Sequence, residues 1–315
     1  MGLLSNILRP FSSKTGRSRV GLQFSAESTH IAAICHTRGI RPQLELCRSI
    51  DSDPLSRPTV AEIVQYNRLG NSSTSMVLDP QDYQLFPANT PDLPKHEWRE
   101  AMQWQIQEHI EQPASNMVVE VFDIPPRKSG TEPERIYVVA AQKTAIERLS
   151  HNSIRTGLTL EQITIPELSL MALTNKLPEQ ESGLGLLQLG RKGGLILIIR
   201  QQTLYLARSI VNSTSLIAEQ NSFSTASQDE VALEIRRTMD FFEGTFDQPP
   251  ITSIYLLPSS QPLPGAQAAL KERLDLPVKE FNIRQLIDVP NHISDSDLIP
   301  ALPAIGAAMT DNQES

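Results

Sequence analysis

The stretch Leu184–Arg200 reads Leu-Gly-Leu-Leu-Gln-Leu-Gly-Arg-Lys-Gly-Gly-Leu-Ile-Leu-Ile-Ile-Arg. Two apolar runs flank a short segment that contains Gly190, Gly193 and Gly194. Short apolar runs bounded by glycine-rich turns are typical of buried strands. The stretch therefore predicts a strand, a tight turn and a second buried strand.

A similar hairpin opens the folded part of the chain. Val20–Cys35 reads Val-Gly-Leu-Gln-Phe-Ser-Ala-Glu-Ser-Thr-His-Ile-Ala-Ala-Ile-Cys. Each hairpin begins a segment in which predicted strands and helices alternate, a pattern typical of α/β architectures. We therefore expect an α/β protein made of two related half-molecules that face a cleft.

Composition excludes several classes of protein. A chain of 315 residues favours two domains, each large enough for its own core. The net charge of −8 argues against a nucleic-acid-binding surface. No window approaches the ~18 uninterrupted apolar residues of a membrane span. Met1–Leu8 lacks the order of charges and apolar residues that marks a signal peptide.

Few residues suggest catalysis or metal binding. Cys35 and Cys47 fall on predicted paired strands, and two cysteines provide too few ligands for a metal site. We expect two free, buried thiols in a reducing cytoplasm. The six histidines are scattered, and no Ser/His/Asp or Cys/His arrangement has a motif spacing.

The segment Met1–Arg19 is basic on an otherwise acidic chain. It contains four cations, no acid and a short apolar stripe that ends at Pro10. One interpretation is a foot that touches the membrane surface, and the other is a solvated, disordered lead. Four cations and one apolar turn attract anionic lipid only weakly, by roughly 1 kcal/mol per cation.

A helix is predicted over Pro94–Glu111, because Trp98, Met102, Ile106 and Ile110 recur every four residues. Trp104 lies off this stripe, and a second core contact is favoured for it over a ligand-stacking role. The predicted domains are as follows: a basic lead 1–19; a first domain 20–175 with an insertion at about 85–133, completed by about 300–309; a second domain 183–299; and a tail 310–315.

In its order of motifs the chain resembles the actin, Hsp70 and sugar-kinase superfamily, and within it the PilM-like proteins of type IV pilus assembly, most of all those of MSHA pilus biogenesis. The matching segments are Val20–His30, Trp104–Pro113, Val139–Lys143, Thr156–Leu158, Glu234–Phe242, Leu263–Gly265 and Ala304–Ala308. The resemblance spans nearly the whole chain. It implies an actin-like, ribonuclease H-like fold of duplicated domains around a cleft, with a small subdomain inserted in the first half.

The nucleotide-binding positions depart from the family pattern. Gln23 and Gln188 stand where active members have an aspartate that holds the magnesium shell, Ser25 stands for a glycine and His30 for a lysine. The Gly-Gly-Gly turn over adenosine is Pro258–Ser260 here. Mg²⁺ requires anionic oxygen, so the cleft is interpreted as vestigial. Its positions are Gln23, Ser25, Gln188, Gly190, Gly193, Ser259 and Ser260.

Two features of the second hairpin have alternative interpretations. Arg191 and Lys192 either meet phosphate without a metal or are exposed turn residues, and the latter is favoured. The three glycines there require only a turn to explain them. We expect no cofactor and no catalysis, with ATP bound weakly if at all.

The resemblance implies a non-enzymatic scaffold at the cytoplasmic face of the inner membrane. Its partner would be a PilN-like bitopic protein, held by that protein's cytoplasmic N-terminal tail, with the pilus assembly ATPase as a second partner. The alternatives are an active ATPase of the same fold and a filament-forming cytoskeletal protein. The oligomeric state stays open.

The resemblance also suggests where the partner docks. In PilM-like proteins the tail lies in a groove of the first domain beside the inserted subdomain, which here is roughly Leu85–Pro133. Trp98 and Trp104 are the candidate groove walls, because aromatic anchors often dominate such interfaces. The alternative is that both tryptophans pack the subdomain.

Overall fold

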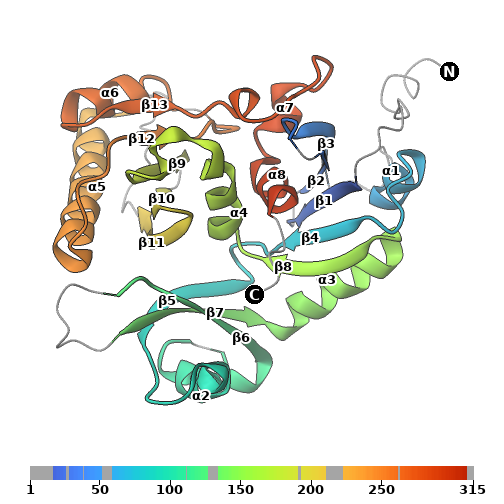
Figure 1. The fold of residues 1–315 in the computed structure, drawn as a ribbon, viewed down its shortest axis with the longest axis horizontal. Helices are drawn as coiled ribbons and strands as arrows, with labels where there is room; N and C mark the ends of the chain where they lie inside the picture. The colour runs from blue at the N-terminus through green and yellow to red at the C-terminus, as the bar shows by residue number, and fades with distance from the viewer. Residues whose placement is uncertain are drawn as a thin grey trace. The chain divides into compact units, whose positions relative to one another are not determined.

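The computed structural model divides the chain into two compact units (Figure 1). Unit 1 comprises the chain up to Phe122, Tyr137–Leu173 and the chain from Arg284 onward, and unit 2 comprises Asp123–Ile136 and Thr174–Ile283. The structure describes residues 17–25, 28–37, 39–51, 59–110, 112–126, 134–190, 193–210, 223–261 and 263–310. Most of the basic lead and the tail from Asp311 therefore lie outside the described residues.

Unit 1 is built on a five-stranded sheet of order β3-β2-β1-β4-β8. Its strands are β1 (Arg17–Phe24), β2 (Ser28–His36), β3 (Gln43–Asp51), β4 (Ser73–Val77) and β8 (Thr159–Thr164). The first three strands form an antiparallel meander, and β4 and β8 then add in parallel.

Unit 2 repeats this plan in the sheet β11-β10-β9-β12-β13. Its strands are β9 (Leu184–Gly190), β10 (Gly193–Arg200), β11 (Thr203–Ile210), β12 (Ile254–Leu256) and β13 (Val278–Glu280). Again three antiparallel strands are followed by two parallel ones. The expected duplication of an α/β half-molecule is confirmed.

Helices cover both faces of the unit 1 sheet. They are α1 (Val60–Tyr66), α3 (Lys143–Thr156), α4 (Pro166–Leu173), α7 (Asp295–Leu298) and α8 (Leu302–Met309). Val20 and Leu22 face the core beneath α1 and α3, and Gly21 between them faces α8 because side chains alternate along a strand. A Cβ on Gly21 would lie 1.8 Å from the Ala304 carbonyl oxygen. Glycine is therefore required for α8 to approach β1 so closely.

The core of unit 2 lies between its sheet and two helices, α5 (Thr225–Phe246) and α6 (Ala266–Arg273). Alternate residues of β9 and β10, such as Leu187 and Ile198, point into this core with Phe242 of α5. Three aromatic rings strengthen it, since Tyr205 meets Phe242 and Phe246 edge-on.

The inserted segment forms a third sheet of order β5-β7-β6 with α2 (Trp98–Gln105). Its strands are β5 (Tyr83–Asn89), β6 (Met117–Asp123) and β7 (Arg135–Gln142). The single helix predicted over 94–111 is wrong in extent, because short 3₁₀ turns occupy Lys95–Glu97 and Ile106–Glu108. The side-chain amide of Gln107 donates hydrogen bonds to the carbonyls of Ile110 and Gln112. These bonds connect the end of the helix to the loop that follows it.

One predicted domain boundary differs from the structure. Residues 284–299, expected in the second half, lie with unit 1. The reason is pairing with β3: Leu44 donates to the Asp288 carbonyl at 2.9 Å, and Ser49 donates to the Asp297 carboxylate at 3.0 Å.

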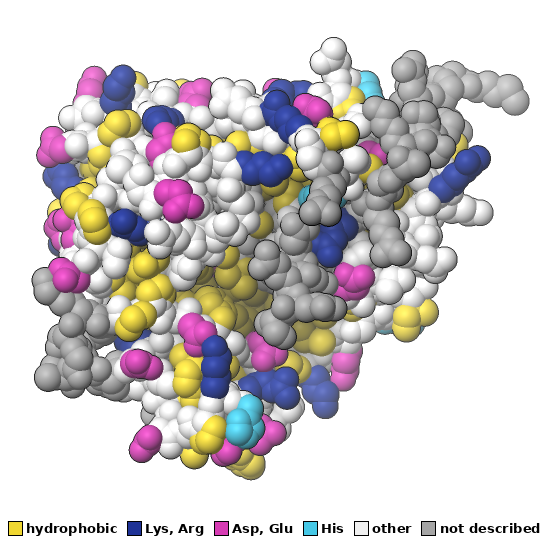
Figure 2. All heavy atoms as spheres, in the orientation of Figure 1, with side chains coloured by type: hydrophobic (Ala, Val, Ile, Leu, Met, Phe, Trp, Pro, Cys, Tyr) yellow, Lys and Arg dark blue, Asp and Glu magenta, His cyan; other side chains and the backbone are white. Residues whose placement is uncertain are grey.

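On the face drawn in Figure 2, Lys and Arg side chains are scattered among Asp and Glu instead of forming one basic field. None of the helices in the described ranges is both long and apolar enough to cross a membrane.

Candidate functional site

The first hairpin uses its polar groups to close its own turn. Gln23 lies opposite His30 in the β1–β2 register, and its side chain is half-buried. The Ser25 hydroxyl donates to the Ser28 carbonyl at 2.9 Å and accepts from the Ser28 amide at 3.1 Å. Ser25 therefore serves the turn, and Gln23 is a neutral residue where the resemblance implies a magnesium-binding carboxylate.

His30 is held as a buried, polar link between β2 and β3. Its Nε2 lies 3.0 Å from the Ser28 hydroxyl, and its Nδ1 lies 2.9 Å from the Ser49 hydroxyl. Burial lowers the pKa of His30, which favours the neutral imidazole. His30 thus supplies hydrogen bonds to the meander and no fixed positive charge for a phosphate.

Close packing explains two glycines of the second hairpin, Gly193 and Gly194. Gly190 lies opposite Gly193 at the end of β9 and β10. Gly193 has φ +143°, and a Cβ there would lie 2.5 Å from the Ile210 carbonyl oxygen. A Cβ on Gly194 would lie 2.5 Å from the Gln188 carbonyl oxygen. The exposed side chain of Gln188 is again an amide, while Arg191 and Lys192 lie outside the described residues.

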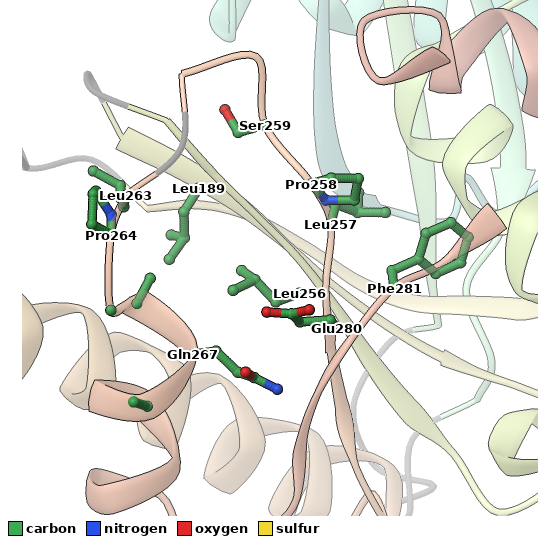
Figure 3. A pocket seen from close by; sticks show the side chains of 13 residues that line it. Leu189, Leu256, Leu257, Pro258, Ser259, Leu263, Pro264, Gln267, Glu280 and Phe281 are labelled. Atoms are coloured by element: carbon green, nitrogen blue, oxygen red, sulfur yellow. The ribbon is translucent and has the colours of Figure 1, made fainter. Parts of the chain in front are cut away.

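A pocket of about 450 Å³ lies in unit 2 beside the turn Pro258–Ser260 (Figure 3). Its walls are mostly apolar. The lining residues are Leu189, Leu256, Leu257, Pro258, Ser259, Leu263, Pro264, Gly265, Ala266, Gln267, Ala268, Glu280 and Phe281. Ser259 Oγ accepts from the Gln261 amide at 3.1 Å, and Ser260 is exposed.

The charge of this pocket disfavours a phosphate group. Figure 3 shows the Glu280 carboxylate close beside Leu256, with Ser259 set apart on its turn. Among the described lining residues Glu280 is the single charge, and none is a cation. A pocket of this kind suits an apolar or cationic group better than a polyphosphate.

The described residues offer no cluster of metal ligands, and their two cysteines are buried. No group of three or more His, Cys, Asp or Glu side chains is placed to hold a metal ion there. Cys35 and Cys47 are free and buried, as predicted, and they oppose Gln43 and Ala32 in the β2–β3 register. Burial raises the pKa of the Cys47 thiol, so Cys47 is a poor nucleophile.

The two tryptophans of the inserted subdomain lie in different environments. Trp98 is half-buried, its Nε1 donates to the Leu93 carbonyl at 2.9 Å, and the Lys95 Nζ lies 5.8 Å from its ring centroid. Trp104 is 84% exposed. The core contact favoured for Trp104 from sequence is wrong, because Met102 and Ile106 face the core and Trp104 points away from them on α2.

The sequence analysis missed two polar clusters, one of them buried. In unit 1 the Tyr83 hydroxyl donates to Glu167 Oε2 at 2.6 Å. In unit 2 Glu179 pairs with Lys279 and accepts from the Tyr255 hydroxyl at 2.8 Å. Burial alone would raise the pKa of Glu179, but hydrogen bonds from Lys279 and Tyr255 lower it. These partners are far apart in sequence, so no local pattern indicates them.

Comparison with known proteins identifies the fold. No protein-family model and no curated protein sequence matches the chain. Among solved structures, the "PilM-PilN type IV pilus biogenesis complex" superposes with a TM-score of 0.65 at 19% identity, over 92% of this chain and 97% of the other. The cytoplasmic domain of EpsL, an inner-membrane component of the type II secretion system of Vibrio cholerae, gives a TM-score of 0.51 at 12% identity, over 93% and 96%. With its two sheets of equal strand order, the chain has the actin-like α/β fold.

Proposed function

We propose that this chain is a non-enzymatic scaffold of a type IV pilus assembly platform, of the MSHA type. It works at the cytoplasmic face of the inner membrane and holds the cytoplasmic N-terminal tail of a PilN-like bitopic protein. The pilus assembly ATPase is a second partner. The near-complete overlap with a protein from a PilM-PilN complex supports this proposal, since 92% of one chain matches 97% of the other.

The main support for a non-enzymatic role is that each hairpin has a neutral glutamine, Gln23 or Gln188, where an aspartate is expected. Gln23 and Gln188 are both amides, and the neighbouring Ser25 and His30 are engaged in hydrogen bonds of the first meander. A hard divalent cation is held by anionic oxygens, and without it the charge of ATP stays uncompensated. The unit 2 pocket adds Glu280, which repels phosphate further.

The competing function is an active ATPase or a nucleotide-controlled switch of the same fold. One observation favours it: both glycine-containing hairpin folds are retained, and a pocket stands beside the Pro258–Ser260 turn. A retained hairpin fold, however, does not by itself supply the metal ion that would neutralise the charge of a triphosphate. The two functions differ in whether the partner's tail binds in the absence of nucleotide.

We place the tail on unit 1, beside the inserted subdomain. The subdomain is tied to the rest of unit 1 where β5 begins and β7 ends, because Gln142 donates to the Asp82 carbonyl at 2.8 Å and Arg148 pairs with Asp82. A groove beside a firmly attached subdomain keeps its shape, which lowers the entropy cost of binding a short peptide.

The test is a titration of the full chain with the cytoplasmic tail of the PilN-like protein, fused to a soluble carrier. We expect saturable binding in nucleotide-free buffer, unchanged by Mg-ATP. The matched control is the same carrier with the tail residues in scrambled order. Binding that requires Mg-ATP would support the switch, and absence of binding under both conditions would overturn the scaffold.

A further inference from the structure

The solvent face of α2 presents an exposed indole next to a carboxylate. Glu100 and Trp104 are four residues apart, so their side chains are neighbours on the helix surface. We call this pair the Glu100–Trp104 surface. Large apolar side chains are usually covered in a folded protein, and Trp104 is the most exposed of those in the described residues, at 84%.

The cations near this surface are directed elsewhere. Arg99 pairs with Glu120 of β6 at 3.8 Å, and Lys95 lies over the Trp98 ring. Gln103 also faces the start of β6, since its amide donates to the carbonyl of Met117, the first residue of that strand, at 3.3 Å and to the preceding Ala114 carbonyl at 2.7 Å. The side of α2 that carries Glu100 and Trp104 is therefore turned away from β6.

Charge on this side of the helix is negative. Glu97, one turn before Glu100, pairs with the exposed imidazole of His96 at 3.5 Å when that imidazole is protonated. Within the described part of the chain, no hydrogen bond or ion pair engages the Glu100 carboxylate. An indole face with a carboxylate one turn away matches a guanidinium or ammonium group, which gains both a cation–π contact and an ion pair.

We infer that the Glu100–Trp104 surface binds the basic residues of the membrane partner's cytoplasmic segment. The inference rests on the proposed function and specifies the chemistry of the partner. Cytoplasmic segments next to a membrane span carry an excess of Lys and Arg, because positive residues are retained on that side. The negative carboxylate at the same time disfavours direct contact with anionic lipid.

The first experiment measures the response of Trp104 itself. The chain contains two tryptophans, so the emission lost on Trp104→Phe is the Trp104 signal. We expect a tetra-arginine peptide to change that signal in a saturable, salt-sensitive way, and a tetra-glutamate peptide to leave it unchanged. No response to tetra-arginine overturns the inference, whatever the partner's tail does.

The second experiment uses the tail fusion with its Lys and Arg residues intact or replaced by Gln. We expect the intact tail to lose about fivefold to thirtyfold in affinity on Glu100→Lys or Trp104→Ala, the range of one exposed cation–π contact plus one ion pair. The neutral tail should bind Glu100→Lys and the unchanged protein equally. Glu147→Lys on α3 and Ile154→Ala, which removes another exposed apolar side chain, are the matched controls.

The outcomes separate the two proposals. If the tail binds tightly and neither Glu100→Lys nor Trp104→Ala weakens it, the inference is wrong and the scaffold function stands. If tetra-arginine shifts Trp104 while the tail does not bind, the surface recognises cations and the scaffold function is wrong.

Discussion

The Tyr83 hydroxyl donates a 2.6 Å hydrogen bond to the buried carboxylate of Glu167 and so joins β5 of the inserted subdomain to the first turn of α4. Burial raises the pKa of Glu167, and the hydrogen bond from Tyr83 acts in the opposite direction. Glu167 is 8% exposed, so water cannot replace the tyrosine hydroxyl easily. The pair fixes the subdomain to the body of unit 1.

Tyr83→Phe should lower the free energy of unfolding by about 1–3 kcal/mol at neutral pH, because a buried acceptor loses its donor. The loss should shrink in acid. Glu167 has a raised pKa in the folded state, so protonation there removes the penalty of a buried, unpaired charge as the pH falls. Chemical denaturation at neutral and mildly acidic pH measures both effects.

Tyr205→Phe is the control for this variant, since the Tyr205 ring packs against Phe242 and Phe246 without a hydroxyl hydrogen bond among the described contacts. It should change stability by about 0.5 kcal/mol or less. Equal losses in Tyr83→Phe and Tyr205→Phe would show that the Glu167 hydrogen bond contributes nothing specific.

Gly21→Ala should disrupt the contact between β1 and α8. The new Cβ would lie 1.8 Å from the Ala304 carbonyl oxygen, which is backbone and cannot rotate away. We expect the free energy of unfolding to fall by at least about 1–3 kcal/mol, or the variant to fail to fold. Gly244→Ala is the matched control, because Gly244 lies within α5 and an added Cβ would have no atom within 4 Å other than those of its chain neighbours and of its own helix backbone. It should stabilise the protein by about 0.5–1 kcal/mol. Equal melting temperatures for Gly21→Ala and the unchanged protein would contradict the packing described for α8.

Mg-ATP should not bind measurably to the purified protein, and no hydrolysis should follow. Gln23 and Gln188 place a neutral amide where an active member is expected to hold the metal with an aspartate. Isothermal titration with ATP, with and without Mg²⁺, measures this. The double variant Gln23→Asp with Gln188→Asp is expected to gain Mg²⁺-dependent affinity. A dissociation constant near about 1 μM for the unchanged protein, equivalent to roughly −8 kcal/mol, would instead establish a working nucleotide site.

The hairpins and their duplication could be predicted because their signals are local. The apolar runs around Gly193 and around Ser25 define strands and turns within a few residues, and the structure confirms both. The extent of α2 could not be predicted in this way. The Gln107 side chain reaches a loop that follows the helix, and such a contact leaves no periodic trace in the sequence.

The candidate site was predictable in part. The substitutions at Gln23 and Gln188 were identified from a resemblance, and their side-chain positions follow from strand register. Trp104 shows the opposite case: it lies off the stripe of Met102 and Ile106, which agrees with its exposure, yet a core contact was the favoured interpretation. The Tyr83–Glu167 pair joins residues 84 positions apart, so only the tertiary structure brings it together.

The last prediction concerns His30 and the acid stability of unit 1. Both ring nitrogens contact hydroxyl groups, and burial lowers the pKa of His30 in the folded protein. The unfolded chain therefore binds the proton more readily, with a pKa of about 6.5. Stability should be fully present above that value and should fall as the pH drops below it toward the lower pKa of the folded state. His30→Gln keeps a donor and an acceptor for Ser28 and Ser49 but cannot take up a proton, so its free energy of unfolding should fall less between pH values of about 7.5 and 5.5. His151→Gln, at an exposed position on α3, should keep the pH dependence of the unchanged protein. Chemical denaturation curves at both pH values measure these free energies. If His30→Gln loses stability in acid as steeply as His151→Gln, His30 is excluded as the titrating group.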